Sequence, residues 1–280
     1  MPGKIKVKFW GVRGSIPTPG KETIRYGGNT SCVEIRVADK ILIFDGGTGL
    51  RLLGEELLKE KTVSASIFFS HFHWDHIQGF PFFTPAFLSK NHFEIFGEKK
   101  MTFTLKDALS GQMTTNHFPV TIKQMESLLK FNNINPGNII NLGDDIKIYT
   151  HKLNHPGGSM AYKVEYHNKH IVFATDHEHS SERINISLSS FIQDADLLIY
   201  DCTYTEDEYM GTNGKLSKKG FGHSTWQEAV RLCKNNNAKR LALFHHDPSH
   251  NDAFLDNLEK VCQKVFPLSK VSYEGLELEI

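Results

Sequence analysis

The chain has 280 residues, of which 39% are hydrophobic and 23% are charged, as is typical of a globular protein with a sizeable core. Basic and acidic residues balance at 32 each, so the formal net charge is zero. A protein that grips a long stretch of nucleic acid usually carries a basic excess. The balance therefore argues against such a protein and favours a small substrate.

The cysteines are too widely spaced to form a C-x-x-C pair. They are Cys32, Cys202, Cys233 and Cys262. Such spacing predicts free thiols in a reducing compartment. The first residues alternate like a strand and lack the apolar core of a signal peptide, and no apolar run has the length of a membrane span. We therefore expect a cytoplasmic location and no membrane partner.

Hydrophobic periodicity and turn residues predict alternating short strands and helices. In chain order, we expect strands at residues 4–10, 29–37 and 40–44, a helix at 50–60, strands at 66–69 and 92–96, helices at 105–110 and 122–131, strands at 146–153, 161–166, 170–174 and 197–200, a helix at 226–235, a strand at 241–244 and a helix at 252–265. Ser224 or Thr225 is the expected N-cap of the helix at 226–235. No clear linker interrupts this series, so we predict a single domain over residues 1–280.

Several of the expected strands end in His or Asp. The strand at 66–69 leads into Ser70 and then into an H-x-H-x-D-H motif formed by His71, His73, Asp75 and His76. Imidazole and carboxylate ligands suit zinc and neighbouring first-row metals. Residues two apart in an extended loop point the same way, so His71 and His73 can hold one ion while Asp75 and His76 turn to a second. The motif predicts half of a two-metal site, and Trp74 within it is expected to pack beneath the metals.

The remaining ligands must come from later strand ends. His155 is the best third histidine for the first ion, with His151 as its rival inside the preceding strand. Asp176 is placed to bridge both ions, and His245 to complete the second. His246 competes with His245, and adjacent residues of a strand face opposite ways, so only one of the two should bind.

An H-x-H-x-D-H motif after a strand, followed by His, Asp and His, resembles the metallo-β-lactamase superfamily. The resemblance implies an α/β fold, a four-layer αββα sandwich with the metals at one edge of its two sheets. Asp45-Gly46-Gly47 resembles the first motif of that family, whose aspartate supports the metal loop. His155, Asp176 and His245 match its third, fourth and fifth motifs. We expect two divalent ions, with zinc favoured and manganese or iron able to replace it.

Two further segments resemble ribonuclease Z. Residues 195–204 contain an acid after a short apolar strand, and residues 222–225 read Gly-His-Ser-Thr. The resemblance implies that His223 is a general acid and that Asp201 orients it. Asp201 stands where ribonuclease Z has glutamate, which leaves the pairing distance open.

The amino-terminal part resembles bacterial proteins of this fold that are described as metal-dependent or cyclic-nucleotide phosphodiesterases. The similar segments are residues 11–17 and 26–32. Their Gly, Asn, Thr and Ser residues could hold phosphate through backbone N–H groups, or could form a tight turn.

The favoured function is a dinuclear-metal phosphodiesterase that acts on a small or cyclic nucleotide. A hydroxide that bridges the metals would attack phosphorus, and His223 would protonate the leaving oxygen. Asp75, His223 and Asp201 are the expected catalytic residues, and Asp75 and Asp176 supply the carboxylates.

Other functions remain open at this stage. A ribonuclease Z-like RNA 3′-processing enzyme usually carries an arm between the third and fourth motifs. Here only 21 positions separate His155 from Asp176, so no dedicated transfer-RNA arm is expected. Thiolesterase, oxidoreductase and non-catalytic metal-sensor functions also remain open, because one fold hosts many activities. The sequence is also compatible with a homodimer.

Overall fold

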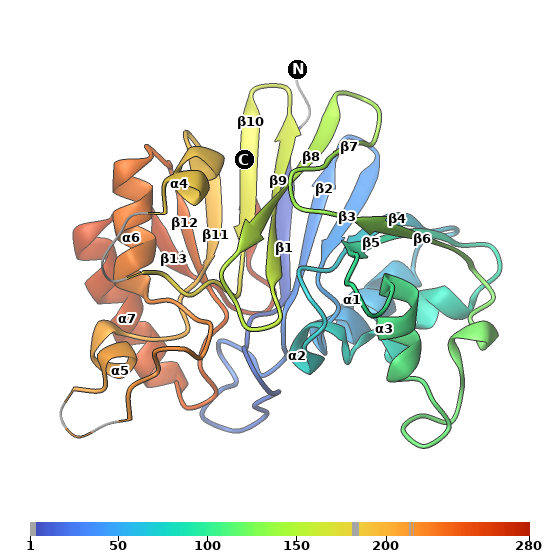
Figure 1. Ribbon diagram of the computed structural model, residues 1–280, viewed down its shortest axis with the longest axis horizontal. Helices are drawn as coiled ribbons and strands as arrows, with labels where there is room; N and C mark the ends of the chain where they lie inside the picture. Colours follow the sequence, from blue (N-terminus) through green and yellow to red (C-terminus); the bar gives the residue numbers. More distant parts are fainter. Residues whose placement is uncertain (1–3, 181–184, 213, 215) are drawn as a thin grey trace. The chain divides into compact units, whose positions relative to one another are not determined.

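The computed structural model describes residues 4–180, 185–212, 214 and 216–280. The chain forms two compact units, each discontinuous in sequence. The first has the bounds Met1–Thr18, Gly27–Asn135 and Tyr273–Glu279, and the second has the bounds Pro19–Tyr26 and Pro136–Ser272 with Ile280. Each unit contains one seven-stranded sheet (Figure 1). The organisation as a single domain over residues 1–280 stays a prediction.

The sheet of the first unit is mixed. Its strands, in spatial order, are β14 (Glu277–Glu279), β1 (Lys6–Gly11), β2 (Cys32–Val37), β3 (Lys40–Phe44), β4 (Ser64–Phe68), β5 (His92–Glu98) and β6 (Leu128–Ile134). The pairs from β14 to β3 are antiparallel, and those from β3 to β6 are parallel. The helical elements of this unit are α1 (Gly49–Leu57), α2 (Trp74–Ile77), α3 (Leu105–Gly111) and the 3-10 turns η1 (Phe80–Phe82), η2 (Thr84–Phe87) and η3 (Ile122–Gln124).

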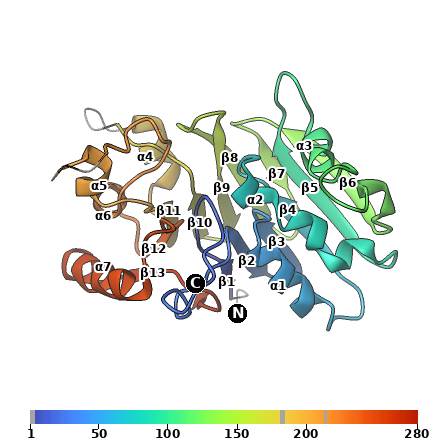
Figure 2. The ribbon, with the colours of Figure 1, turned by 90° about the horizontal axis from the view of Figure 1, so that it is seen from below.

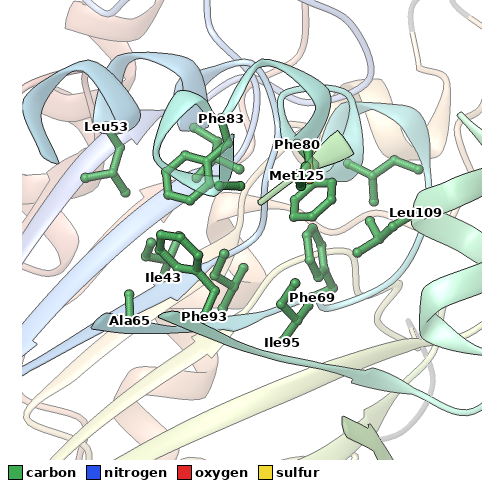
Figure 3. Close-up of a cluster of buried hydrophobic side chains, with 14 of the residues drawn as sticks. Ile43, Leu53, Ala65, Phe69, Phe80, Phe83, Phe93, Ile95, Leu109 and Met125 are labelled. Atoms are coloured by element: carbon green, nitrogen blue, oxygen red, sulfur yellow. The ribbon is translucent and has the colours of Figure 1, made fainter. Parts of the chain in front are cut away.

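A cluster of aliphatic and aromatic side chains fills the space between this sheet and the helical segments that cover it. Figure 3 shows Leu53 and Phe83 facing Ile43 and Phe93 of the strands. All four side chains are buried, and burying each contributes about 1.5–3 kcal/mol. Phe69 also belongs to the cluster, and only Ser70 separates it from the histidine motif. The core therefore fixes the chain where the motif begins.

The sheet of the second unit is also mixed. Its strands, in spatial order, are β13 (Ser269–Val271), β12 (Leu241–Phe244), β11 (Leu197–Asp201), β10 (Lys169–Ala174), β9 (Ser159–Tyr166), β8 (Ile146–Leu153) and β7 (Ile139–Asn141). The pairs from β10 to β13 are parallel, and those from β7 to β10 are antiparallel. The helices of this unit are α4 (Ile186–Ile192), α5 (Glu206–Met210), α6 (Trp226–Asn235) and α7 (Asp252–Val265). Helices α6 and α7 pack beside β11, β12 and β13 (Figures 1 and 2).

Most expected elements are confirmed, and the helix expected at residues 122–131 is wrong. The chain there makes the short turn η3 and then enters β6, which pairs with β5 from Leu128 to Ile134. Ile122 and Met125 are buried in the core, and this produced the helical spacing of apolar residues. Pairing with the sheet edge outweighs that local pattern.

Two smaller expectations are confirmed. Thr225 is the N-cap of α6, and its side chain accepts a hydrogen bond from the N–H of Glu228. All four cysteines are free and buried. Within the described ranges, no helix is both long and apolar enough to cross a bilayer.

Replacing Leu53 by Ala should destabilise the first unit by about 2–5 kcal/mol, because it leaves a cavity in a close-packed core. Leu128→Ala is the matched control, since Leu128 is 64% exposed in the same unit and should cost less than about 1 kcal/mol. Denaturant unfolding followed by circular dichroism would measure both. Equal losses in the two variants would contradict this description of the core.

Candidate metal-binding residues

The first unit gathers the H-x-H-x-D-H motif into one cluster at the end of β4. The ring centroid of His71 lies 4.4 Å from that of His73 and 4.2 Å from that of His76. Nε2 of His76 lies 3.2 Å from Oδ2 of Asp75. His71, Asp75 and His76 are buried, while His73 is exposed. One exposed side chain therefore lies beside three buried ones.

The carboxylate of Asp45 supports this cluster from the end of β3. It accepts hydrogen bonds from the backbone N–H of Ser70 at 2.7 Å, from the hydroxyls of Ser70 and Ser31 at 2.9 and 3.1 Å, and from Nδ1 of His76 at 2.7 Å. Because β3 and β4 are parallel, Asp45 and Ser70 follow strand ends at the same edge of the sheet. A charge-assisted hydrogen bond from His76 to this fully buried carboxylate fixes the orientation of the imidazole.

The glycine after Asp45-Gly46 allows the metal loop to approach the backbone. A Cβ at Gly47 would lie 2.2 Å from the carbonyl oxygen of Asp75, so no larger residue fits there. On its other side Asp75 accepts a hydrogen bond from the backbone N–H of Ser15 at 2.7 Å, within the segment 11–17. The amino-terminal loop thus helps to orient a metal-loop carboxylate.

Trp74 does not pack beneath the ligands as we expected. It begins the four-residue helix α2, and its side chain is 81% exposed. The neighbouring Asp75, His76 and Ile77 are the buried residues of that helix. A helix of one turn cannot bury all its side chains, so the residue on its outer side remains accessible to solvent.

The second unit brings its candidate residues together by parallel strand pairing. Asp176 follows β10, Asp201 ends β11, and His245 follows β12. Strands β10, β11 and β12 are parallel neighbours, so their carboxyl ends meet at one edge. β8 runs in the same direction, because it and β10 are both antiparallel to β9, and His155 follows its end.

Several of these strand ends turn through backbone conformations that few side chains adopt. The φ angles are 61° at Asp45, 58° at Asp176 and 63° at His245. Residues other than glycine are uncommon in this left-handed region, although Asp and His are enriched there. Such conformations cluster at functional sites, where the surrounding structure holds them in place.

Asp176 is the centre of the second group. Its Oδ1 lies 3.6 Å from Nε2 of His155, and its Oδ2 lies 3.3 Å from Nε2 of His245. Potential ligand atoms of Asp176, His223 and His245 all lie within 4.8 Å of one another. One carboxylate therefore presents each of its oxygens to a different imidazole, which is the arrangement needed to contact two ions.

Asp201 pairs with His223, at the distance that the sequence left open. Nδ1 of His223 lies 2.9 Å from Oδ2 of Asp201. Burial opposes ionisation of Asp201, but the facing His223 outweighs it and holds the pKa of Asp201 below its ordinary value. An ionised acceptor at Nδ1 keeps the proton on that nitrogen and leaves Nε2 of His223 directed away from the pair.

The two competing histidines lie elsewhere in the second unit. His151 stacks on Phe191, with ring centroids 4.9 Å apart. Nε2 of His246 lies 2.8 Å from the carbonyl oxygen of Ser272, and its ring meets Tyr26 edge-on. Of each competing pair, His155 and His245 are therefore the members that lie beside Asp176.

Sequence reasoning missed Glu178, which orients part of this group. Oε1 and Oε2 of Glu178 accept hydrogen bonds from the backbone N–H groups of Gly220 and Gly222, at 2.6 and 2.9 Å, and so hold the loop that carries His223. Gly222 has φ 88°, and a Cβ there would lie 2.3 Å from Nδ1 of His155. No local pattern in the sequence marks Glu178 for this role.

His177 is a structural residue. It is buried, its Nδ1 accepts a hydrogen bond from the N–H of Asn154, and its own N–H donates to Asp201. Burial lowers the pKa of His177 to about 4, so its ring is neutral at physiological pH.

The imidazoles are oriented as metal ligands require. Nδ1 of four of them lies 2.7–3.1 Å from a protein oxygen: His71 with Ser70, His76 with Asp45, His155 with Gly222 and His245 with Thr203. The hydroxyls of Ser70 and Thr203 also donate to carboxylates, so they accept from the imidazoles. This assigns the proton to Nδ1 and the lone pair to Nε2. Burial also lowers the pKa of His155, which favours the neutral, ligating form. The residues fit divalent metal ions.

Comparison with known proteins agrees with this chemistry. The beta-lactamase superfamily domain model matches residues 42–246. The chain is 23% identical to a ribonuclease Z from Prochlorococcus marinus (strain MIT 9515), over 99% of this chain and 100% of that protein.

Solved structures are similar over nearly the whole chain. The metallo-beta-lactamase fold protein YhfI from Bacillus subtilis has a TM-score of 0.70 and 22% identity, with 99% of each chain covered. A diphosphatase from the PhnP family has a TM-score of 0.69 and 16% identity, covering 100% of this chain and 98% of that one. The predicted α/β metallo-β-lactamase fold is confirmed by these similarities and by the two mixed sheets with flanking helices.

Asp45→Asn should weaken metal affinity about 10- to 100-fold, because the neutral amide orients His76 less firmly and lowers its basicity. Competition with a chromophoric chelator would measure this. Asp145→Asn is the matched control, since Asp145 is exposed and has the same φ of 61°. Unchanged affinity in a folded Asp45→Asn protein would show that Asp45 does not support the ligands.

Proposed function

We propose that this chain, which belongs to the beta-lactamase superfamily and is a metal-dependent hydrolase, hydrolyses small or cyclic nucleotide phosphodiesters. The observation that carries the proposal is the Asp201–His223 pair at 2.9 Å, beside Asp176. A buried carboxylate that holds an imidazole in one tautomer is suited to deliver a proton to a departing oxygen. Hydrolysis of an alkyl phosphodiester needs such a proton.

The proposed metal ligands come from both groups of residues. They are His71, His73, Asp75, His76, His155, Asp176 and His245. Zinc suits this mixture of imidazole and carboxylate, and manganese or iron could replace it. Seven ligand residues exceed what a single tetrahedral ion needs, which supports two ions.

The mechanism assigns a separate task to each part of the chain. When bound, the two ions would supply an activated water and neutralise charge on the phosphoryl oxygens. Asp201 keeps the proton of His223 on Nδ1, so that Nε2 can carry a second proton to the leaving oxygen. The backbone N–H of Ser15 donates a hydrogen bond to Asp75 and so fixes the orientation of its carboxylate.

The second candidate is an RNA 3′-processing endonuclease. It is favoured by the relative from Prochlorococcus marinus, which is named ribonuclease Z. The similarity to that protein extends over 99% of this chain and 100% of the relative. The interval from His155 to Asp176 holds only β9, β10 and their turns, which leaves no room for a long arm. A panel of cyclic nucleotides, dinucleotides and precursor transfer RNA separates the two candidates.

Two further assignments accompany this proposal. Four free, buried cysteines are consistent with a reducing compartment, so we keep a cytoplasmic location as part of it. A homodimer is also retained as an oligomeric state.

A non-catalytic sensor would bind metal but would turn over none of the substrates in the panel.

Asp75→Ala should leave a folded protein with little activity, because it removes a carboxylate from the metal cluster. The assay is hydrolysis of a chromogenic phosphodiester after metals are stripped and restored, with metal content measured in parallel. Full turnover by this variant would exclude the mechanism.

His223→Asn should slow the hydrolysis of an alkyl diester about 100-fold or more, because the leaving alkoxide then lacks its proton donor. A 4-nitrophenyl diester should be far less affected, since its leaving group departs as a stable anion. His167→Asn is the control at an exposed position. The same loss of kcat for both substrates would refute the role of His223 as general acid.

A further inference from the structure

A cavity of about 560 Å³ opens in the first unit beside the metal loop. Its walls come from Phe72, Trp74 and Ile77 of the loop and α2, from Phe103, and from α3 with the segment that follows it. Gln112, just after α3, donates a hydrogen bond to the carbonyl oxygen of Ile77 in α2 at 2.9 Å, so these two segments lie side by side. This volume is within the range of small-molecule sites.

The cavity is joined to the ligand cluster through the chain itself. Phe72 stands between His71 and His73, and Trp74 stands between His73 and Asp75. The cavity and the ligand cluster therefore border the same short segment of the chain. None of the ligand residues lines the cavity, so it is a separate compartment of the site.

The cavity presents planar apolar surfaces together with amide groups. The rings of Phe72 and Phe103 meet edge-on at 5.8 Å, and the exposed ring of Trp74 adds a third surface. Gln78 and Gln112 each donate one N–H, to Thr30 and to the carbonyl of Ile77, and their amide oxygens have no partner among the described residues. Aromatic rings can stack on a base, and amide oxygens can accept from its amino or ring N–H groups.

The charge of the lining selects which part of a nucleotide would enter. Asp107 lines the cavity, and its hydrogen bonds with Thr104 keep its pKa below the ordinary value, so it is negative at neutral pH. Asp107 is the one carboxylate among the described residues of the lining, which also includes the imidazole of His117, and its negative charge repels phosphate. The neutral, planar end of the substrate is the part that matches this compartment.

We propose that the cavity binds the nucleobase of the substrate by stacking on Trp74 and Phe103, while the phosphodiester lies at the ligand residues. This inference rests on the proposed function and specifies its substrate as one that carries a base. The base would then contribute to binding, and the phosphodiester would be positioned by the loop that both compartments share.

The test compares adenosine 5′-monophosphate with ribose 5-phosphate by calorimetry on the zinc-loaded protein. The base should improve affinity about fivefold or more. Trp74→Ala and Phe103→Ala should remove most of that gain without changing the affinity for ribose 5-phosphate. Phe82→Ala is the control, because Phe82 is an exposed phenylalanine of the same unit that packs against Phe118, outside the cavity.

A second variant blocks the cavity instead of removing its walls. A Cβ at Gly111 would have no neighbour within 4 Å, so Gly111→Leu extends into the open space without a clash at its Cβ. It should abolish the advantage of the base, with thermal stability and zinc content unchanged. Equal affinities for the two ligands in the wild type, or equal weakening of both by these variants, would overturn the inference.

The outcome is separable from that of the proposed function. Hydrolysis of phosphodiesters without any preference for a base would leave the function standing and remove the nucleobase site. Binding that depends on the base, in a protein without hydrolytic turnover, would leave the nucleobase site standing and remove the proposed function. Binding of adenosine 5′-monophosphate that is insensitive to Gly111→Leu would place the base elsewhere and also refute the inference.

Discussion

Parallel pairing of strands is the constraint on which the candidate residues of both units depend. Parallel neighbours end at the same edge of a sheet, and loops at that edge can bring together residues that are distant in sequence. In the first unit this places Asp45 beside Ser70 and the histidine motif. In the second it places Asp176 and Asp201 at one edge with His245. The strands themselves are almost wholly apolar and buried, so their ends hold firm positions.

Burial of so many polar groups would be costly unless each were hydrogen-bonded. Asp45 meets this condition with four hydrogen bonds in the absence of solvent. The same contacts also set the tautomer of His76, so one network stabilises the fold and orients a proposed metal ligand. Thr203 acts similarly in the second unit, where it donates to Asp201 and accepts from His245. In such a network, stability and metal chemistry cannot be altered independently.

The strands and the motif residues could be predicted from the sequence because both are local signals. A short apolar run that ends in His or Asp indicates a strand and its functional end at once, as at residues 241–245. The segment 122–131 could not be read in this way, because its apolar residues serve a 3-10 turn and an edge strand in succession. Glu178 escaped notice because its role depends on two backbone N–H groups more than 40 positions away. Contacts of that kind are created by the fold and have no local pattern.

The exposure of Trp74 follows from the alternation of side chains along the loop. Successive side chains of an extended segment point in opposite directions. Along residues 71–74, imidazole therefore alternates with an aromatic ring, and the rings of Phe72 and Trp74 line the cavity while His71 and His73 pack together at 4.4 Å. Ligand geometry and the aromatic wall thus depend on the same few backbone angles. A shift of the loop by one residue would exchange its two faces. The burial of Phe69 and Ile77 at the two ends of the loop opposes such a shift, so it holds the imidazoles and the aromatic rings on their respective faces.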